Sequence, residues 1–589
     1  MMETLKHKGL LFWAAVYLLL FAFLQTGHAF HFYFVEQNQM FLHTWPYVAE
    51  HLLQPGGVAL MLSEYLLQFF ILPYAGAVIT AALLTGVGCL AYGLGRRIAP
   101  GANLLIACLL PLVALLFAHF DFNYFLYGTV AFLLMEATLY LVLGIGRPAL
   151  RLGAQLLATP ILFGLAGPVA LLYALSAAVY ELFGRSKPSY LVLLAVGEAL
   201  LIGILSVYFA LYGEYRHALL PDGYYHLSLA PRSVIYFSWC AFPAVILLAC
   251  ILGRRKAVRR KRLWTESVVQ GVCLAALCVW GIPEYADKKS AMLKELDYYC
   301  RTEQWDKILK RCEGTLSNYL YIGYANLALA QKGELGERMF AYDQRGTQGL
   351  LVNWNKTSSI SILLSELYFA MNEVAPAQEM AFEAYVSATG YGNPRMLKRL
   401  VQTNLIYGAY AVAEKYLAIL EQTYAYRAWA KAHRPFLYND ALVAADPLLG
   451  SKRRSLMPVR KLALIDDGID VELQQIAQAN PKATASIHFA GAFYLLAKDM
   501  NRFQALIETY FDTPVLPVLP LAFQEAVIIL SENAPDYPQR FRISEAVIRR
   551  FAAYRQQVVA NNRGGNSSAL PGLMRRSYGD TYWFYFMFK

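Results

Sequence analysis

Long apolar stretches follow one another through the first half of the chain, and they predict helices that cross a membrane. A helix needs about 20 apolar residues to span the hydrocarbon core of a bilayer. We predict nine such spans, because a Gly/Pro break at residues 166–168 divides one long apolar stretch into two. The nine predicted spans are residues 9–27, 74–94, 102–119, 124–146, 152–166, 168–184, 188–212, 233–253 and 263–282.

After residue 282 the pattern changes to amphipathic helices. Residues 283–431 contain three similar helical hairpins, whose turns at Gly333, Asn372 and Gly408 are 39 and 36 residues apart. This spacing resembles that of tetratricopeptide-type repeats. We therefore expect an all-α protein in which a polytopic membrane domain, residues 1–282, precedes a domain of helical repeats.

The helical periodicity lapses over residues 434–455, which we interpret as a loop or a domain joint. It lies within a further helical region, 432–589, that ends in seven closely spaced aromatic residues. We expect these rings to pack against the helical repeats or the membrane domain; the alternative is an aromatic wall for a sugar or a lipid headgroup. The aromatic residues are Tyr578, Tyr582, Trp583, Phe584, Tyr585, Phe586 and Phe588.

The composition agrees with two regions of different kind. Hydrophobic residues make up 57% of the chain and charged residues 16%, with a mean hydropathy of +0.37. Residues 1–282 hold 17 basic and 11 acidic residues, against 35 and 30 in residues 283–589, so the lipid-embedded region is the first half. The net charge of +11 is not gathered in a basic tail or stripe. Nucleic acid is therefore not expected as a partner.

Basic residues between the spans fall mainly on one side of the membrane. With a cytoplasmic N-terminus, 15 Lys and Arg residues lie in the inner segments and two, Arg216 and Arg232, in the outer ones. Such asymmetry is the positive-inside signature. The segments 28–73, 119–123 and 213–232 are then outer segments, and the C-terminal half also faces outward.

The first outer segment opens with a polar stretch, "HFYFVEQNQMFLHTWPYVAEHLLQPGG" at residues 31–57. Glu36 follows soon after the first span and is the only Asp, Glu, Lys or Arg residue of this segment before Glu50. A carboxylate at the membrane face can act as general base for a hydroxyl or amide acceptor. The alternative is that Glu36 is a solvated surface group. Next, residues 58–72 carry Ser63, Glu64 and Gln68 on one side and predict a helix lying flat at the interface.

This order of features resembles the membrane glycosyltransferases of the C superfamily, which use polyprenyl-phosphate sugars. Those enzymes carry an acid in the first outer loop, then an interfacial helix and the second span, and many end in a periplasmic soluble domain. Here "EQNQ" stands where paired acids are more common. The resemblance implies transfer of a sugar from a polyprenyl-phosphate donor. Glu36 would be the base, assisted by His43, with Gln37 and Gln39 beside the substrate.

Two other outer segments supply further candidate residues. Asp121 lies in a short turn where the superfamily sometimes carries a second acid; the alternative is an Asp favoured by turn geometry. Arg216, together with His217, and Arg232 are expected to bind the donor phosphate, because guanidinium groups suit phosphate. The alternative is that these arginines contact lipid phosphates.

Two acids, Glu136 and Glu198, lie within predicted spans. Intramembrane carboxylates are costly and usually functional, so they keep a transporter in consideration, although a neutral Glu hydrogen-bonded between helices is simpler. The histidine spacings are not a ligand signature and no CxxC pair occurs, so no metal site is predicted. The cofactor is unknown, and a divalent metal has no ligand motif to support it.

A membrane-anchored interaction scaffold is the alternative function, in which the helical repeats bind a protein or glycan partner. The chain also resembles an uncharacterised family of bacterial polytopic proteins with an "EQ…PGG…QFF" loop, here beginning at Glu36, and an aromatic C-terminus. That resemblance implies no activity. It implies a Gram-negative source, and hence a multi-pass protein of the bacterial inner membrane with a periplasmic C-terminal domain.

Overall fold

The computed structural model contains helices and no β-strand in the residues it describes. These residues are 2–185, 188–254, 260–286, 288–388, 392–456, 468–563 and 569–589. Contacts divide the chain into two compact units. Of the described residues, unit 1 comprises those up to 294 with a short later segment, 422–425, and unit 2 comprises the rest.

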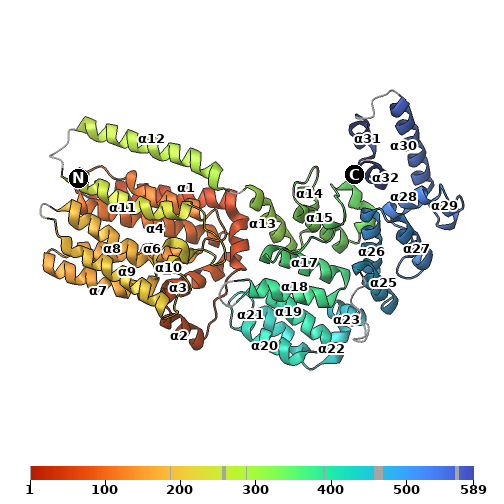
Figure 1. Cartoon of the computed structure of the whole chain (residues 1–589), viewed down its shortest axis with the longest axis horizontal. Helices are drawn as coiled ribbons and strands as arrows, with labels where there is room; N and C mark the ends of the chain where they lie inside the picture. Colours follow the sequence, from red (N-terminus) through yellow and green to blue (C-terminus); the bar gives the residue numbers. More distant parts are fainter. Residues whose placement is uncertain are drawn as a thin grey trace. The chain divides into compact units, whose positions relative to one another are not determined.

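Most helices of unit 1 pack around a shared apolar core (Figure 1). Short single-turn helices extend several of them, such as η1 (Gln68–Ile71) after α3 and η5 (Pro221–Tyr224) after α10. The helices are α1 (Met2–Glu36), α2 (Trp45–Leu53), α3 (Gly57–Leu67), α4 (Ala75–Ile98), α5 (Leu110–Ala118), α6 (Leu126–Leu143), α7 (Pro148–Ala166), α8 (Val169–Val179), α9 (Leu193–Tyr208), α10 (Tyr215–Leu219), α11 (Val234–Gly253) and α12 (Arg260–Tyr285).

Seven helices in the described part of the chain are long and apolar enough to cross a membrane. The remaining two predicted spans, 102–119 and 168–184, correspond to shorter apolar helices, Ala107–Ala118 and Val169–Gly184. The described residues thus form seven helices of membrane length, and the other two predicted spans are shorter apolar helices. Pro111 lies in the first turn of α5, which begins later than the predicted span, and the Gly/Pro break directly precedes α8, where the span was predicted to begin.

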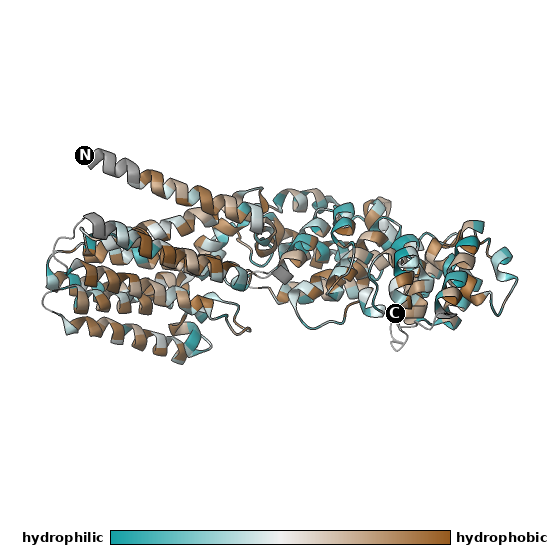
Figure 2. Cartoon of the chain, turned by 90° about the horizontal axis from the view of Figure 1, so that it is seen from above, coloured by the Kyte–Doolittle hydropathy of each residue, from teal (hydrophilic) through white to brown (hydrophobic). Residues whose placement is uncertain are grey.

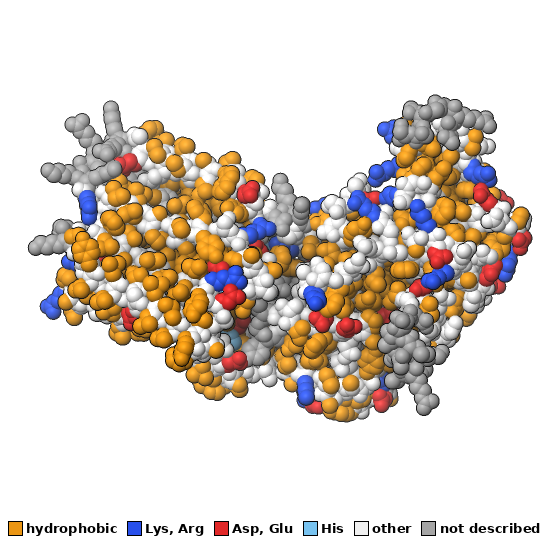
Figure 3. All heavy atoms as spheres, viewed as in Figure 1, with side chains coloured by type: hydrophobic (Ala, Val, Ile, Leu, Met, Phe, Trp, Pro, Cys, Tyr) orange, Lys and Arg blue, Asp and Glu red, His pale blue; other side chains and the backbone are white. Residues whose placement is uncertain are grey.

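Large apolar side chains are exposed along the helices of unit 1. Leu157 of α7, Leu201 of α9 and Trp280 of α12 are 65%, 55% and 57% exposed. Figure 2 colours these helices as hydrophobic along most of their length, and Figure 3 shows hydrophobic side chains over much of their visible face. Soluble proteins rarely expose apolar surface on this scale. The surface is compatible with a multi-pass membrane protein.

The basic residues behind the predicted orientation lie only partly among the described residues. Lys187 and most of the basic run at 254–262 lie outside the described residues. Arg151 was expected in an inner loop, yet it is buried within α7. Its Nε donates a hydrogen bond of 2.6 Å to Glu181, which also pairs with Arg185. Arg151 therefore belongs to a buried ion pair.

Unit 2 is built from shorter helices, beginning in α13 (Lys288–Arg301), part of which belongs to unit 1. Its other helices are α14 (Trp305–Arg311), α15 (Tyr319–Gln331), α16 (Leu335–Arg338), α17 (Ser358–Met371), α18 (Val374–Val386), α19 (Pro394–Tyr407), α20 (Tyr410–Glu421), α21 (Arg427–His433), α22 (Asp440–Ala445), α23 (Pro447–Arg454), α25 (Ile469–Ala479), α26 (Thr484–Ala497), α27 (Met500–Tyr510), α28 (Leu521–Leu530), α29 (Tyr537–Arg540), α30 (Glu545–Arg563), α31 (Leu570–Tyr578) and α32 (Tyr582–Phe588).

The three predicted hairpin turns are confirmed as left-handed helix ends. Gly333, Asn372 and Gly408 have φ angles of 71°, 74° and 74°, and each follows the last turn of a helix. Glycine and asparagine adopt this conformation at low cost, which is why they stop a helix there. A fourth turn of the same kind occurs at Lys498, between α26 and α27. Lysine gives no turn signal, so the sequence did not reveal it.

Residues 434–455 do not form the loop that the sequence predicted. They contain η8 (Arg434–Phe436) and helices α22 and α23. Side-chain caps start both helices: Asn439 accepts the backbone N–H of Leu442, and Asp446 accepts that of Leu449. The prediction was wrong because such short helices show too few residues to establish a periodicity, whereas capping residues also occur in loops.

The packing of the aromatic C-terminus is confirmed. Tyr582, Trp583, Phe584 and Tyr585 of α32 are all at most 5% exposed. They lie within unit 2, where the backbone carbonyl of Glu525 in α28 accepts the indole N–H of Trp583 at 2.7 Å. The same Glu525 also accepts the backbone N–H of Tyr582 on its carboxylate, at 2.7 Å.

Replacing Glu525 by glutamine is expected to change how stability depends on pH. Burial raises the pKa of this carboxyl to about 8, against the opposing hydrogen bond from Tyr582. A raised carboxyl pKa contributes stability that is present below pH 4.5 and is lost as pH rises through about 8. Unfolding of the full chain in detergent, from pH 5 to 9, should show that E525Q reduces this loss by on the order of 2 kcal/mol. The exposed E532Q is the control, and equal curves for E525Q and wild type would contradict the expectation.

Candidate functional site

The first candidate residues lie at the end of α1, which extends further than the predicted span. The helix continues past a non-helical residue, His28, and ends at Glu36. Glu36, Gln37 and Gln39 are 3%, 0% and 5% exposed, and in the described part of the chain Gln39 Oε1 has no hydrogen-bond partner. The expectation of an open loop from residue 28 is therefore wrong for residues 28–36. The aromatic side chains of this stretch pack inward and keep it helical.

The end of α1 meets the short turn that carries Asp121. The rings of Phe34 and Phe122 are in edge contact at 5.2 Å, and His28 stacks on Phe120 at 4.7 Å. Glu36 is two residues from Phe34, and Asp121 precedes Phe122. The two predicted acids thus come from the two sides of one aromatic contact, as expected from a short turn between neighbouring helices.

Backbone hydrogen bonds join the Asp121 turn to the segment between α9 and α11. Tyr124 and Tyr225 form an isolated antiparallel bridge. On its two sides, Phe125 N–H donates to Tyr224 O and His226 N–H donates to Asn123 O, both at 3.0 Å. This bridge fixes residues 213–232 against residues 119–125, although about a hundred residues separate them in the chain.

Asp121, Asn123, Tyr225 and Arg232 form a polar cluster at this bridge, called here the Asp121 cluster. Asp121 Oδ1 accepts two hydrogen bonds of 3.0 Å from the backbone and side-chain amides of Asn123. Asp121 Oδ2 accepts the Tyr225 hydroxyl at 2.6 Å and lies 3.3 Å from Arg232 Nε. The Asp121 side chain is 6% exposed and that of Arg232 is 42% exposed.

In this cluster the Asp121 carboxylate is buried, and the Arg232 guanidinium reaches the surface. Burial, together with the Asp121 carboxylate, raises the pKa of Tyr225 well above its ordinary value, so the phenol stays protonated and donates. A guanidinium has five N–H donors, and Asp121 faces the one on Nε. The arrangement can therefore orient Arg232 toward an anionic group.

The other two predicted phosphate ligands lie elsewhere in the same segment. Arg216 forms an exposed pair with Glu214 at 2.6 Å, which is a weak surface interaction, and His217 is buried in α10. A pair that the sequence gave no reason to select lies nearby in the chain: the Tyr236 hydroxyl donates to Asp222 at 2.5 Å. The residues around Asp222 have the composition of a turn, and the sequence gave no other reason to select Asp222.

The helix predicted to lie flat at the interface buries its polar side. Ser63, Glu64 and Gln68 are at most 8% exposed, whereas Leu62 and Tyr65 are 40% and 43% exposed. A helix lying flat at the interface would turn its polar side toward water, so this burial does not fit the predicted interfacial helix. The polar side turns inward because the protein supplies hydrogen-bond partners for it.

Glu64 contacts two side chains of α2. The Tyr47 hydroxyl donates to Glu64 Oε2, and His51 Nε2 lies 3.2 Å from the same oxygen. Burial disfavours a charged His51, but hydrogen bonds to Glu64 and to the Tyr47 carbonyl outweigh it and raise the pKa of His51. His43, the predicted assistant of Glu36, is exposed and instead contacts Gln68 Oε1 at 3.0 Å.

The "PGG" turn after α2 has a packing role. Gly56 has a φ of 79°, and a Cβ there would lie 1.9 Å from the Tyr127 hydroxyl. Its N–H donates to Gly164 O at 2.9 Å, beside the break between α7 and α8. Two motifs that the sequence treated separately, the glycine turn and the Gly/Pro break, thus pack together.

The intramembrane acids differ in their surroundings. Glu136 of α6 is fully buried, and neither carboxylate oxygen has a hydrogen-bond partner among the described residues. Glu198 of α9 is partly exposed, and its Oε2 likewise has no partner there. In the part of the chain that the structure describes, no group of three or more His, Cys, Asp and Glu residues could hold a metal ion.

Comparison with known proteins gives a family and no activity. A family model described as "Family of unknown function (DUF6057)" matches residues 4–589. No curated protein matches the chain. No solved structure matches it either.

Proposed function

Since the chain belongs to the DUF6057 family, whose function is unknown, we propose an activity from the site itself: transfer of a sugar from a polyprenyl-phosphate donor to an acceptor at the periplasmic face of a bacterial inner membrane. The observation that carries this proposal is the contact between Asp121 and Arg232. Both residues were selected from the sequence, in different segments, and they lie side by side.

In the proposed reaction Arg232 binds the donor phosphate and Glu36 is the general base. The acceptor hydroxyl gives its proton to the Glu36 carboxylate, and its oxygen forms a bond to the anomeric carbon. The bond from that carbon to the phosphate oxygen breaks, and polyprenyl phosphate leaves with the electron pair. Asp121 and Tyr225 position Arg232.

The sidedness of the site rests on charge and on this contact. Nine spans and seven spans are both odd, so either number puts the C-terminal half opposite a cytoplasmic N-terminus. Four helices, α6, α7, α8 and α9, separate Asp121 from the 213–232 segment, so the two would face opposite sides if the short helix α8 did not cross. Their contact supports a crossing at α8, and the contact between Phe34 and Phe122 supports a crossing at α5 and hence a shared outer face.

We expect release of polyprenyl phosphate, the product common to any sugar and acceptor. The full chain in vesicles would be supplied with a panel of polyprenyl-phosphate sugars and a membrane extract as acceptor source. E36Q and R232Q should lower the rate about a hundredfold or more, because each removes a group that contacts the reacting atoms. E214Q, which changes an exposed acid in the same segment, is the matched control.

The positioning role of Asp121 has its own readout. D121N should raise the KM for the donor more than it lowers kcat, because it loosens Arg232 without removing the base. Wild-type protein that releases no polyprenyl phosphate from any donor, or E36Q protein with undiminished activity, would end the proposal.

A membrane-anchored interaction scaffold is the second candidate function. The helical hairpins of unit 2, with their left-handed turns at Gly333, Asn372 and Gly408, favour it, because stacked hairpins present extended binding surfaces. A scaffold would bind a protein or glycan equally well with Glu36 or with glutamine at that position. Loss of function in E36Q protein that still binds its partner would therefore favour the enzyme.

A further inference from the structure

Unit 2 contains a pocket of about 440 Å³, a size typical of small-molecule sites. Residues of α13, α17, α19 and α23, and of the connection before α26, line it. Six of the lining side chains are basic and two, Glu303 and Glu366, are acidic. The basic residues are Arg301, Arg395, Lys398, Arg399, Lys452 and Lys482.

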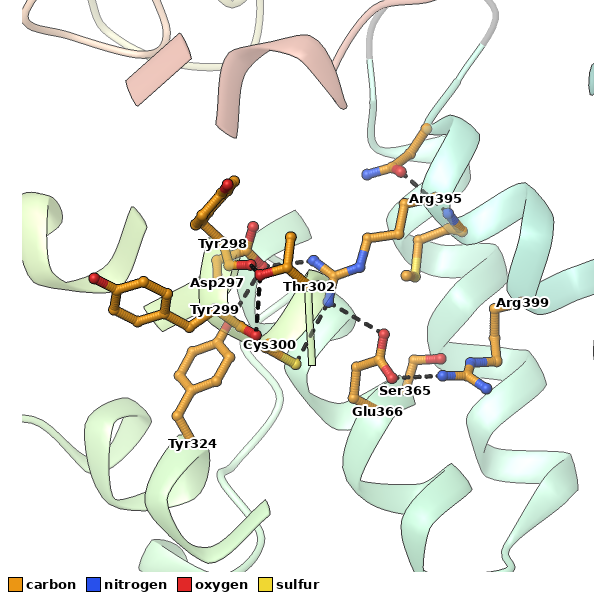
Figure 4. A network of polar contacts seen from close by, with 12 residues as sticks. Asp297, Tyr298, Tyr299, Cys300, Thr302, Tyr324, Ser365, Glu366, Arg395 and Arg399 are labelled. Carbon is orange, nitrogen blue, oxygen red and sulfur yellow. Dashed lines mark hydrogen bonds and ion pairs between the residues drawn. The ribbon is translucent and has the colours of Figure 1, made fainter. Parts of the chain in front are cut away.

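Two of the arginines are held in place by acids, the buried Asp297 and the partly buried Glu366 (Figure 4). Arg395 lies between Asp297, at 2.7 Å, and Glu366, at 3.2 Å. Arg399 pairs with the second oxygen of Glu366, and its guanidinium stacks 3.7 Å from the centre of the Phe369 ring. The charges of these two arginines are balanced by those of Asp297 and Glu366, so the arginines form a fixed wall of the pocket.

The lysines are not balanced in this way. Lys398 lies 4.9 Å from the centre of the Trp429 ring, and Lys452 donates to Asn372 Oδ1 at 2.7 Å and to the Phe369 carbonyl. Within the described residues, no ion pair joins Lys398, Lys452 or Lys482 to an acid. The pocket therefore carries an excess of positive charge.

Burial perturbs these lysines, and the neighbouring cations add to the effect. Burial, with repulsion from Arg399, lowers the pKa of Lys452 to about 7. Burial also lowers the pKa of Lys398, with repulsion from Arg301, Arg395 and Arg399. Holding several cations close together costs free energy, and a bound anion would remove that cost.

We propose that this pocket binds a phosphate ester in its dianionic form. The ammonium groups of Lys398, Lys452 and Lys482 are point charges that suit phosphate, whereas recognition of a planar carboxylate favours a free guanidinium fork. The Arg395 fork is already used by Asp297 and Glu366. A dianion also offsets the excess positive charge of the pocket better than a monoanion does. This site is independent of the function proposed for unit 1.

Isothermal titration of the full chain in detergent with glycerol 3-phosphate and with pyrophosphate tests the proposal. Lys482 is exposed, so K482E should fold; it should weaken binding of both probes about tenfold or more, because one charge-assisted contact is lost and a repulsive one is added. K398Q should weaken binding in the same direction. K415E makes the same charge reversal on the exposed face of α20, outside the pocket, and should leave binding unchanged.

Saturable binding that K482E weakens and K415E does not would support the site. No saturable binding to wild type, equal weakening by both reversals, or tighter binding of citrate than of pyrophosphate would overturn it. Vesicles containing phosphatidic acid, titrated beside glycerol 3-phosphate, distinguish a lipid-borne phosphate ester from a soluble one. Whether the lipid-borne or the soluble phosphate ester binds, K482E must weaken that binding.

Discussion

Replacing Arg395 by methionine in the full chain is expected to lower the free energy of unfolding of unit 2 by about 3–5 kcal/mol. The Arg395 side chain is 8% exposed, and those of its partners Asp297 and Glu366 are 4% and 17% exposed. Methionine fills similar space but leaves these carboxylates without their shared cation. Removing one member of a buried ion pair is costly because the remaining charge cannot reach water.

The pH dependence separates this charge effect from a packing defect. Burial tends to raise the pKa of Glu366, yet Arg399 and Arg395 together hold it below the usual value. The wild-type stabilisation is therefore present above the ordinary carboxyl pKa and is lost as pH falls through the lowered one. In R395M the carboxyls accept protons more readily, so the difference from wild type should shrink in acid.

Urea unfolding of the full chain in detergent, read by pulse proteolysis of unit 2, provides the measurement. R311M is the control: Arg311 pairs with Glu295 at 2.9 Å, but its side chain is 49% exposed, so the loss should stay within about 1 kcal/mol. A similar loss in both variants, or a loss in R395M that does not change with pH, would contradict the assignment.

Truncation of Trp583 to alanine is expected to cost a similar amount, about 3–5 kcal/mol. Trp583 is 2% exposed, and its ring lies 5.0 Å from that of Phe551 and 5.9 Å from that of Tyr554. The substitution leaves a cavity and also leaves the Glu525 carbonyl without its indole donor. Both losses fall on the contact between α28, α30 and α32.

The same unfolding measurement applies, with two comparisons. W583F keeps most of the buried volume and loses the hydrogen bond, so its loss should be intermediate. W45A makes the same deletion at a residue of α2 that is 74% exposed, and should change stability by about 0.5 kcal/mol or less. A loss below about 1 kcal/mol in W583A would show that the aromatic C-terminus does not anchor unit 2.

Parts of the candidate sites could be predicted because their signals are local. Asp121 and Arg232 were selected as an acid in a short turn and a rare outer arginine, and the structure brings them to 3.3 Å. Their pairing itself was not predicted. The pairing depends on the bridge between Tyr124 and Tyr225, which no pattern in either segment indicates.

The basic pocket of unit 2 was missed for the same reason. Asp297 and Arg395 are 98 positions apart, and each is one charged residue among 41 acids and 52 bases. Lys452 lies in the stretch interpreted as a loop, where the short helix α23 carries it to Asn372 and Phe369. Only contacts between elements distinguish these residues from solvated surface charges.

The sequence by itself determined the helical class, the apolar first half and the positions of the turns at Gly333, Asn372 and Gly408. These follow from hydrophobicity and backbone preference, which act over one helix or one turn. The tertiary structure alone decided that the polar side of α3 is buried, that α1 extends to Glu36, and that six cations line one pocket. Burial and charge pairing depend on which distant segments meet, and local patterns carry no information about that.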